Sequence, residues 1–165
     1  VTHDQDVALA ISDRILVFDK HGAIRQVGTP EELYDDPKDS YIYKFMGVSN
    51  FLPTDIKGGI PYLKPTGEAI GPETELKDGP MTMACRPSDV ILSREGGVRA
   101  KVMRVAYLGH NFDYRLSIGD SEVRAQIDTH EALERKLVFE PGDECRASFG
   151  RVKWFEPEQA KEEVL

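Results

Sequence analysis

After residue 50 the sequence breaks into short strand-like runs, and this feature most constrains the fold. The runs are rich in β-branched, aromatic and other apolar residues, and turns containing Gly or Pro separate them. Many short strands at this spacing favour a small sandwich or barrel. The predicted strands are FLPTDI, PYLKP, MTMACRP, VILSR, VRAKVMRVAYLG, FDYRLSIG, SEVRAQI and ECRASFGRVKWF; only THEALERKL, residues 129–137, is predicted to be helical here.

The first fifty residues instead alternate helix and strand. Their helix-start signals are the acidic residues Asp4 and Asp6 and a capping box from Thr29 to Glu32 with Pro30 at the first helical position. The apolar run RILVF predicts a buried strand, and AIRQVG predicts the second strand of a hairpin. The predicted elements are helices over 4–12, 30–34 and 40–46 and strands over 14–18 and 23–28.

Composition bounds the function. The chain has 165 residues, of which 40% are hydrophobic and 30% charged, and this is a globular balance. Its formal net charge of −8, with no basic stripe, argues against nucleic acid or an anionic membrane surface as a partner. No apolar run is long enough to cross a bilayer and no signal peptide is evident, so we expect a cytosolic protein.

The two cysteines, Cys85 and Cys145, are far apart and have no C-x-x-C spacing. We expect buried free thiols in a reducing compartment rather than a disulfide, a nucleophile or a metal site. His130 and Glu134 share one face of the predicted helix, but two groups make a poor metal site. The sequence therefore predicts no metal site.

His3 is the polar residue with most chemical interest, because it lies at a predicted strand-to-helix junction. In open α/β sheets, side chains at the carboxyl ends of strands meet the ligand. A neutral imidazole can donate from one ring nitrogen to a phosphate oxygen and accept with the other. The spacing alone favours the alternative, an exposed histidine near a helix start that has no function.

The segment from Val1 to Pro37, VTHDQDVALAISDRILVFDKHGAIRQVGTPEELYDDP, together with FMGVSN, resembles the end of the nucleotide-binding domain of ABC-transporter ATPases. The resemblance lies in V-T-H-D-Q, A-x-x-x-S-D-R-I and G-x-I-x-Q-x-G-T-P-x-E-L-Y-x-x-P. It implies that His3 is the histidine that contacts the γ-phosphate of ATP in the closed ATPase dimer. Gly28, Thr29 and Pro30 match a structural turn of that family.

The sequence also departs from that family. It contains no G-x-x-x-x-G-K-[ST] phosphate loop, no apolar strand ending in Asp-Glu to hold Mg²⁺, and no signature loop. His3 alone cannot position ATP and water for hydrolysis. The resemblance thus implies the C-terminal piece of an ATPase subunit, with ATP and Mg²⁺ as cofactors of the intact parent and none bound by this chain. Val1-Thr2 is then expected to be the end of a strand whose sheet neighbours are absent. The leading segment is expected to be partly disordered, or to pair in a non-native way.

The second half strengthens the resemblance. MACRPSDVILSR, GVRAKVMRVAYLGHNFDYRLSIGDSEVRAQ and FEPGDECRASFGRVKWF occur in the order of the transport-associated OB (TOBE) domain of importer ATPases. Two residues here are candidates for a ligand or regulatory contact. Arg86, before Pro87, could bind an anion or form a structural ion pair with Asp89. His110 lies at a predicted hairpin tip, where we expect an exposed turn residue; a contact with a ligand or with another subunit is the alternative.

These observations predict an α+β chain in three parts. Residues 1–49 are a remnant of a P-loop ATPase domain, residues 50–157 an OB-like, mainly antiparallel β-barrel, and residues 158–165 an acidic tail. The boundary is placed near Gly47–Asn50. We expect the aromatic residues of this part in the core and rim of the barrel: Tyr62, Tyr107, Tyr114, Phe149 and Trp154. An alternative hypothesis is that exposed aromatic side chains stack on the bases of a single-stranded nucleic acid, but the acidic charge disfavours it.

By resemblance, the function is regulation and dimerisation of the ATP-binding subunit of an ABC importer. The implied partners are a second copy of that subunit and membrane-spanning permease subunits, which would hold it on the inner face of the membrane. The motifs look most like the sulfate or thiosulfate branch, although the iron(III), polyamine, molybdate and sugar branches share much of the pattern. The alternative is a stand-alone module that binds a small oxyanion.

Overall fold

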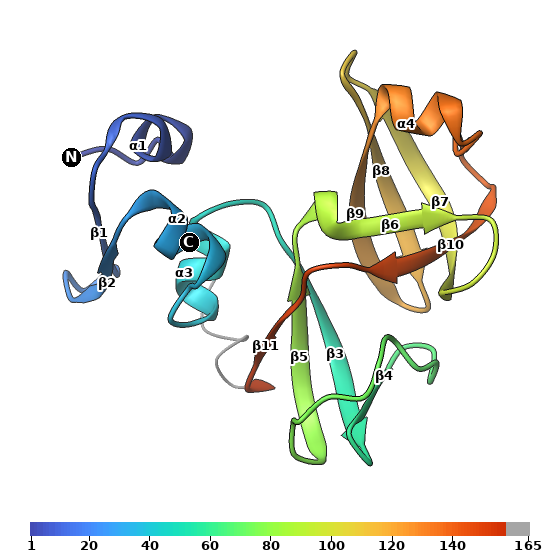
Figure 1. Ribbon diagram of the computed structural model, residues 1–165, viewed down its shortest axis with the longest axis horizontal. Coiled ribbons are helices and arrows are strands. Elements are labelled where there is room, and N and C mark those ends of the chain that lie inside the picture. Colours follow the sequence, from blue (N-terminus) through green and yellow to red (C-terminus); the bar gives the residue numbers. More distant parts are fainter. Residues whose placement is uncertain (158–165) are drawn as a thin grey trace. The chain divides into compact units, whose positions relative to one another are not determined.

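Figure 1 shows a computed structural model of the chain, which describes residues 1–157. The predicted acidic tail, residues 158–165, lies outside the described residues. The chain divides into two compact units, which we call unit 1, Val1–Ser49, and unit 2, Asn50–Pro157. No helix of the described chain is long and apolar enough to cross a membrane.

Unit 1 is a hairpin with three short helices. Its elements are α1 (Gln5–Ile11), β1 (Ile15–Phe18), β2 (Ile24–Gly28), α2 (Pro30–Asp35) and α3 (Ser40–Phe45). The predicted capping box of α2 is confirmed, because Thr29 Oγ1 accepts from the Glu32 N–H at 3.2 Å and the Glu32 carboxylate accepts from the Thr29 N–H at 2.9 Å. Local sequence therefore fixes where this helix starts.

The hairpin turn of unit 1 is held by Asp19. Its carboxylate accepts hydrogen bonds from the backbone N–H groups of His21 (2.9 Å) and Ala23 (3.0 Å), and Gly22 takes a positive φ of 80°. The hydrogen bond from Ala23 is the main reason why the pKa of the Asp19 carboxyl is lowered. The turn predicted at DKHG is thus confirmed.

The core of unit 1 is small: Val17, Leu33, Ile42 and Met46. Two features differ from the prediction. β1 is a strand but not a buried one, because Leu16 and Phe18 are 49% and 50% exposed and only Val17 is buried. A two-stranded sheet with one covered face leaves alternate side chains in solvent. Val1-Thr2 does not form part of a strand, and α1 is a formed helix rather than a disordered segment.

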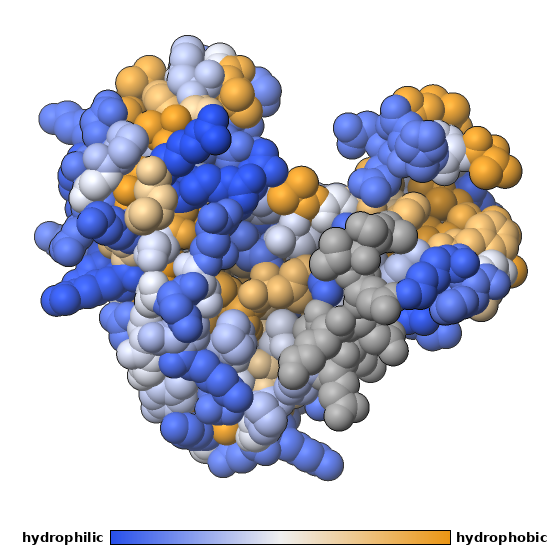
Figure 2. All heavy atoms as spheres, turned by 180° about the vertical axis from the view of Figure 1, so that it is seen from behind, coloured by the Kyte–Doolittle hydropathy of each residue, from blue (hydrophilic) through white to orange (hydrophobic). Residues whose placement is uncertain are grey.

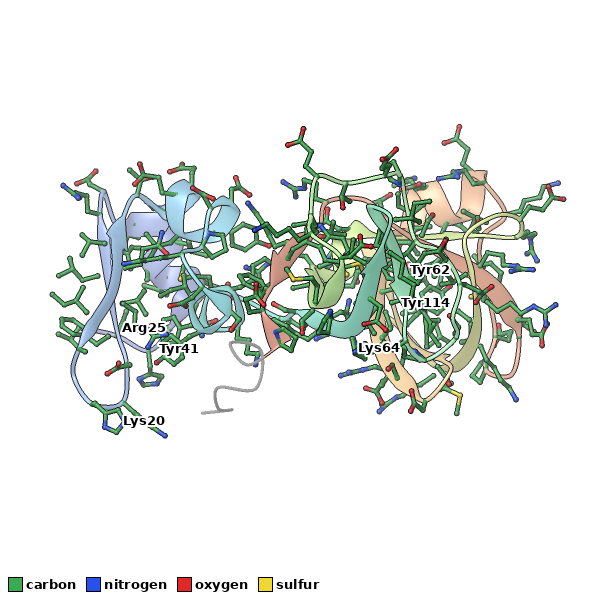
Figure 3. All side chains as sticks on the ribbon, turned by 90° about the horizontal axis from the view of Figure 1, so that it is seen from below. Lys20, Arg25, Tyr41, Tyr62, Lys64 and Tyr114 are labelled. Carbon is green, nitrogen blue, oxygen red and sulfur yellow. The ribbon has the colours of Figure 1, made fainter. Side chains whose placement is uncertain are left out.

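Arg25 connects β2 to α3 in unit 1. Its guanidinium donates to Asp39 at 2.8 Å and lies over the Tyr41 ring at 5.2 Å, and Tyr41 donates its hydroxyl to the Phe18 carbonyl at 3.1 Å (Figure 3). Asp39 is also the N-cap of α3, because its carboxylate accepts from the Ile42 N–H. These contacts fasten the hairpin to the last helix of the unit.

Unit 2 is built from antiparallel strands in two sheets. One sheet has the order β6-β10-β7-β8-β9 and the other β11-β5-β3-β4. The elements are β3 (Asn50–Lys57), β4 (Ile60–Leu63), β5 (Gly79–Cys85), the 3₁₀ turn η1 (Pro87–Asp89), β6 (Val90–Ser93), β7 (Val98–Tyr107), β8 (Asn111–Ile118), β9 (Ser121–Asp128), α4 (Thr129–Glu134), β10 (Glu144–Phe149) and β11 (Lys153–Phe155).

The five-stranded sheet is curled. β6 and β9 are its two outer strands, yet they contact each other, so the sheet folds around one core (Figure 1). Tyr114 and Phe139 are the largest side chains of that core, and the Tyr114 hydroxyl accepts from the Phe139 N–H at 3.3 Å. The predicted fold class, a hairpin with short helices followed by a mainly antiparallel OB-like β unit, is confirmed.

Candidate functional site

His3 lies in unit 1, immediately before α1. The residues beside it are fixed by their own hydrogen bonds: Thr2 Oγ1 accepts from the Asp4 N–H at 3.0 Å, and the Asp4 carboxylate caps α1 by accepting from the Val7 N–H at 3.0 Å. The imidazole is exposed and makes no hydrogen bond with another described residue. A fixed backbone thus presents a histidine whose two nitrogens are available.

His3 is one of the residues that line a pocket of about 490 Å³. The other polar lining residues are Thr2, Asp4, Gln5, Ser12 and Arg14, and most of the apolar lining comes from β1 and the end of α3. Arg14 and His3 can donate hydrogen bonds to an anion, whereas Asp4 would repel one. The residues that line this pocket include no phosphate loop and no acidic pair for Mg²⁺.

Arg86, the second candidate, lies inside unit 2. It is only 3% exposed and stands at the N-cap of η1, where its carbonyl accepts from the Asp89 N–H at 3.0 Å. The Asp89 carboxylate accepts from Arg151 Nε at 3.2 Å, an ion pair that the sequence analysis did not predict. In this conformation a dissolved anion does not reach a side chain as buried as Arg86.

His110, the third candidate, lies in the turn between β7 and β8, as predicted, and is exposed. The turn is tied to α4, because Thr129 donates its N–H to the His110 carbonyl at 3.0 Å and its hydroxyl to the Gly109 carbonyl at 2.8 Å. Tyr107 and Leu108, next to it, are 64% and 50% exposed. The tip therefore offers an imidazole beside apolar side chains on a fixed backbone.

Both thiols are free and buried, as predicted. Burial raises the pKa of Cys85 to about 12 and that of Cys145 to about 11, so neither is a thiolate at neutral pH. Among residues 1–157, no three His, Cys, Asp or Glu side chains are grouped so as to hold a metal ion. The described residues thus present no cluster of metal ligands, and neither thiol is activated.

Comparison with protein families matches residues 83–155, from β5 to β11, to the TOBE domain. This chain contains a TOBE domain. The match covers the whole five-stranded sheet, the end of β5 and β11, but not β3 and β4, which precede residue 83. The sequence resemblance in the second half of the chain is thereby confirmed.

Curated relatives extend the similarity over both units. The spermidine/putrescine import ATP-binding protein PotA of Pseudomonas fluorescens is 33% identical over 161 residues, which is 92% of this chain and 43% of that protein. The Fe(3+) ions import ATP-binding protein FbpC of Rhizobium etli is 37% identical over 143 residues, which is 83% of this chain and 39% of that protein. The sulfate/thiosulfate import ATP-binding protein CysA of Burkholderia pseudomallei is 34% identical over 160 residues, which is 94% of this chain and 44% of that protein.

The TOBE-containing chain therefore spans about two fifths of the length of these relatives, and it is homologous to the C-terminal region of ABC importer ATP-binding subunits. Among solved structures, the cytoplasmic molybdate-binding protein ModG is similar, with a TM-score of 0.53 and 14% identity. The similarity covers 66% of this chain and 96% of that one. At this identity the likeness shows the fold alone.

Proposed function

We propose that this chain forms the C-terminal part of the ATP-binding subunit of an ABC importer. ATP hydrolysis by the complete subunit would drive solute uptake through permease subunits, which hold it on the inner face of the membrane. The observation that carries the proposal is the extent of the similarity: it runs through both units, over 92% of the chain for PotA, but over only 43% of that relative.

The surface of unit 1 supports the proposal. Unit 1 is small, yet apolar side chains of α1 and of both hairpin strands are exposed to solvent (orange in Figure 2). Exposed apolar area on this scale marks a surface that packs against further protein. In the complete subunit the remaining nucleotide-binding domain would cover it. The residues concerned are Val7, Ile11, Leu16, Phe18, Ile24 and Val27.

His3 is the residue of this chain that we assign to the nucleotide. Its imidazole would donate to the terminal phosphate of ATP, and Arg14, in the same pocket, could add a second donor. Bound Mg²⁺ would neutralise phosphate charge and align the reacting group, and residues outside this chain would hold it. This chain would supply hydrogen-bond donors to a single phosphate group, so alone it should not hydrolyse ATP.

A pair of histidine variants tests this assignment in the protein encoded by the complete reading frame. His3→Ala should lower ATP turnover by about 100-fold, because a transition-state contact is lost. His21→Ala, an exposed histidine of the hairpin turn, is the matched control and should leave turnover unchanged. Equal turnover in the two variants would remove His3 from the site.

For unit 2 we propose a coupling and dimerisation role, with a second copy of the subunit as partner. The exposed tip at Tyr107, Leu108 and His110 is the surface we assign to that contact, because apolar side chains stand there on a hydrogen-bonded turn. Arg86 we assign to the structure of η1 rather than to a ligand. Sedimentation at increasing concentration should show a dimer that Leu108→Asp weakens, and a concentration-independent monomer would contradict the role.

Sulfate or thiosulfate is the solute we propose to test first, on the motifs CRPSDVILSR and GHNFDY. The relatives are named for spermidine/putrescine, Fe(3+) and sulfate/thiosulfate at 33–37% identity, so identity does not separate these solutes. Complementation separates these solutes: the complete gene is introduced into a strain that lacks the corresponding importer subunit, and growth on each solute is measured. Growth on sulfate supports the choice, and rescue on another solute alone replaces it.

A second candidate function is the binding of a small oxyanion by unit 2, whose fold is similar to that of a molybdate-binding protein. Calorimetry of this chain against sulfate, thiosulfate and molybdate tests it. Saturable heat with micromolar affinity would support the sensor, and the absence of heat would leave the coupling role.

A further inference from the structure

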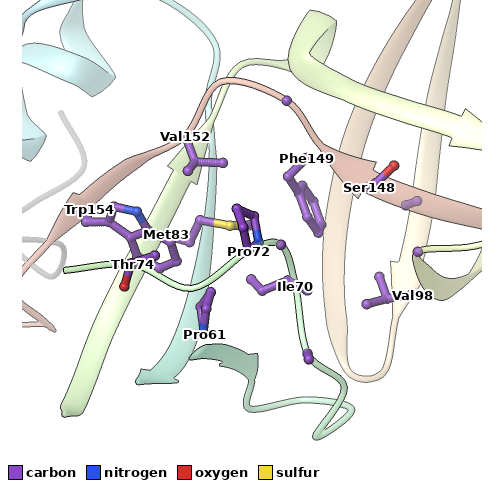
Figure 4. A pocket seen from close by; sticks show the side chains of 15 residues that line it. Pro61, Ile70, Pro72, Thr74, Met83, Val98, Ser148, Phe149, Val152 and Trp154 are labelled. Atoms are coloured by element: carbon purple, nitrogen blue, oxygen red, sulfur yellow. The ribbon is translucent and has the colours of Figure 1, made fainter. Parts of the chain in front are cut away.

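Unit 2 contains a pocket between its two sheets that none of the candidate residues lines. It has a volume of about 240 Å³. Met83 of β5 and Trp154 of β11 line it from one sheet, and Val98 of β7 and Phe149 of β10 line it from the other (Figure 4). The segment 69–74 borders it with Ile70 and Pro72.

The lining is uncharged. None of the fifteen lining residues is Asp, Glu, Lys, Arg or His, and an indole, a phenyl ring and a thioether lie among them. A charge that entered would lose its hydration without gaining a charged partner, and this is unfavourable. The pocket therefore disfavours the oxyanions that the relatives' names suggest.

One side-chain donor of the lining is available to a ligand. The Trp154 indole N–H makes no hydrogen bond with a described residue. The Thr74 hydroxyl, in contrast, is engaged, because it donates to the Gly59 carbonyl at 2.9 Å and accepts from the Leu76 N–H at 3.3 Å. A ligand with one hydrogen-bonding substituent would meet the pocket's chemistry.

Size sets the remaining limit. An apolar protein cavity of about 150 Å³ holds a benzene molecule. A space of about 240 Å³ holds one ring with a small substituent and excludes a nucleotide. Flat rings are favoured, because Trp154 and Phe149 offer aromatic faces and Met83 offers a polarizable sulfur.

From these observations we propose that the pocket between the sheets binds a small uncharged molecule built around a single ring with one hydrogen-bonding group. Such a ligand touches both sheets, so binding stabilises their packing and raises the stability of unit 2. The site is separate from the nucleotide contact proposed at His3, and it stands whether or not the chain serves an importer.

The test uses Trp154, which is the only tryptophan of the chain and so reports from the pocket itself. Phenol is the uncharged probe, and benzoate is the same ring with a charge. Phenol should change Trp154 emission saturably, shift the Met83 methyl signal in NMR spectra and raise the melting temperature, with benzoate binding at least about tenfold more weakly. A linear, non-saturable response to phenol, or equal binding of benzoate, would overturn the proposal.

Filling variants locate the site. Ala69→Phe adds a ring at an exposed lining position and should weaken phenol at least about tenfold, whereas Ala23→Phe, the same change at an exposed alanine of unit 1, should not. Val152→Phe fills the pocket from the other side and serves if the first variant does not fold. Unchanged phenol binding in a folded filling variant would place the ligand elsewhere and refute the site.

Discussion

The side chain of Asn50 pairs with the backbone of Arg124 as a neighbouring strand would. Its amide nitrogen donates to the Arg124 carbonyl at 2.8 Å, and its amide oxygen accepts from the Arg124 N–H at 2.8 Å. Asn50 begins β3 in one sheet and Arg124 lies in β9 of the other, so one buried amide joins the two sheets. The same amide lies 3.7 Å from Cys85 Sγ.

We expect Asn50→Ala to destabilise unit 2 by about 2–3 kcal/mol, because it leaves the N–H and carbonyl of Arg124 without their partners. Urea unfolding followed by Trp154 fluorescence measures the change. Asn111→Ala is the matched control, because the Asn111 amide oxygen is buried without a hydrogen bond and its removal should cost less than about 0.5 kcal/mol. Equal losses in the two variants would contradict the joining role.

The ion pair between Arg124 and Asp113 should stabilise unit 2 more than the ion pair between Arg115 and Glu122, which joins the same two strands. Arg124 donates to both Asp113 oxygens, with the shortest contact at 2.6 Å, and both side chains are half-buried. Arg115 and Glu122 form an exposed single contact at 2.8 Å. We expect Arg124→Met to cost about 1–2 kcal/mol and Arg115→Met less than about 0.5 kcal/mol, and the opposite order in urea unfolding would refute this ranking.

The two thiols make stability depend on pH at the alkaline end. Burial raises the pKa of Cys85 to about 12 and that of Cys145 to about 11, from an ordinary value of 9.0. Because the folded pKa values are the higher ones, this stabilisation is fully present below pH 9 and is lost as the pH rises through 11 and 12. The free energy of unfolding should therefore fall above pH 9, and less steeply in Cys85→Ala.

The same burial predicts slow thiol modification. At pH 8 a thiol reagent should modify Cys85 and Cys145 only as fast as unit 2 opens, and urea should release both. Rapid labelling of the folded protein would show that the thiols are accessible.

Much of the order of elements could be predicted from sequence. Gly and Pro mark the turns of unit 2, so every predicted run but the last corresponds to one strand, and the Thr29–Glu32 spacing predicts the start of α2. The last run, residues 144–155, divides into β10 and β11, which lie in different sheets. These signals are local, and local chemistry decides them.

What depends on distant partners could not be predicted. Alternation along a strand gives its faces but not its neighbour, so the separation into two sheets was missed. An apolar run does not reveal which side is covered, and Leu16 and Phe18 are accordingly exposed. The roles of Asn50 and of the pocket residues arise from segments far apart in the chain, and nothing in their local sequence indicated them.

The central claim is that this chain belongs to an ATP-binding subunit and supplies only one of its phosphate contacts. ATP turnover by residues 1–165 and by the product of the complete reading frame, measured side by side with Mg²⁺, tests it most directly. The account predicts hydrolysis by the complete product and background turnover by residues 1–165. Hydrolysis above background by residues 1–165, or none by the complete product, would contradict it.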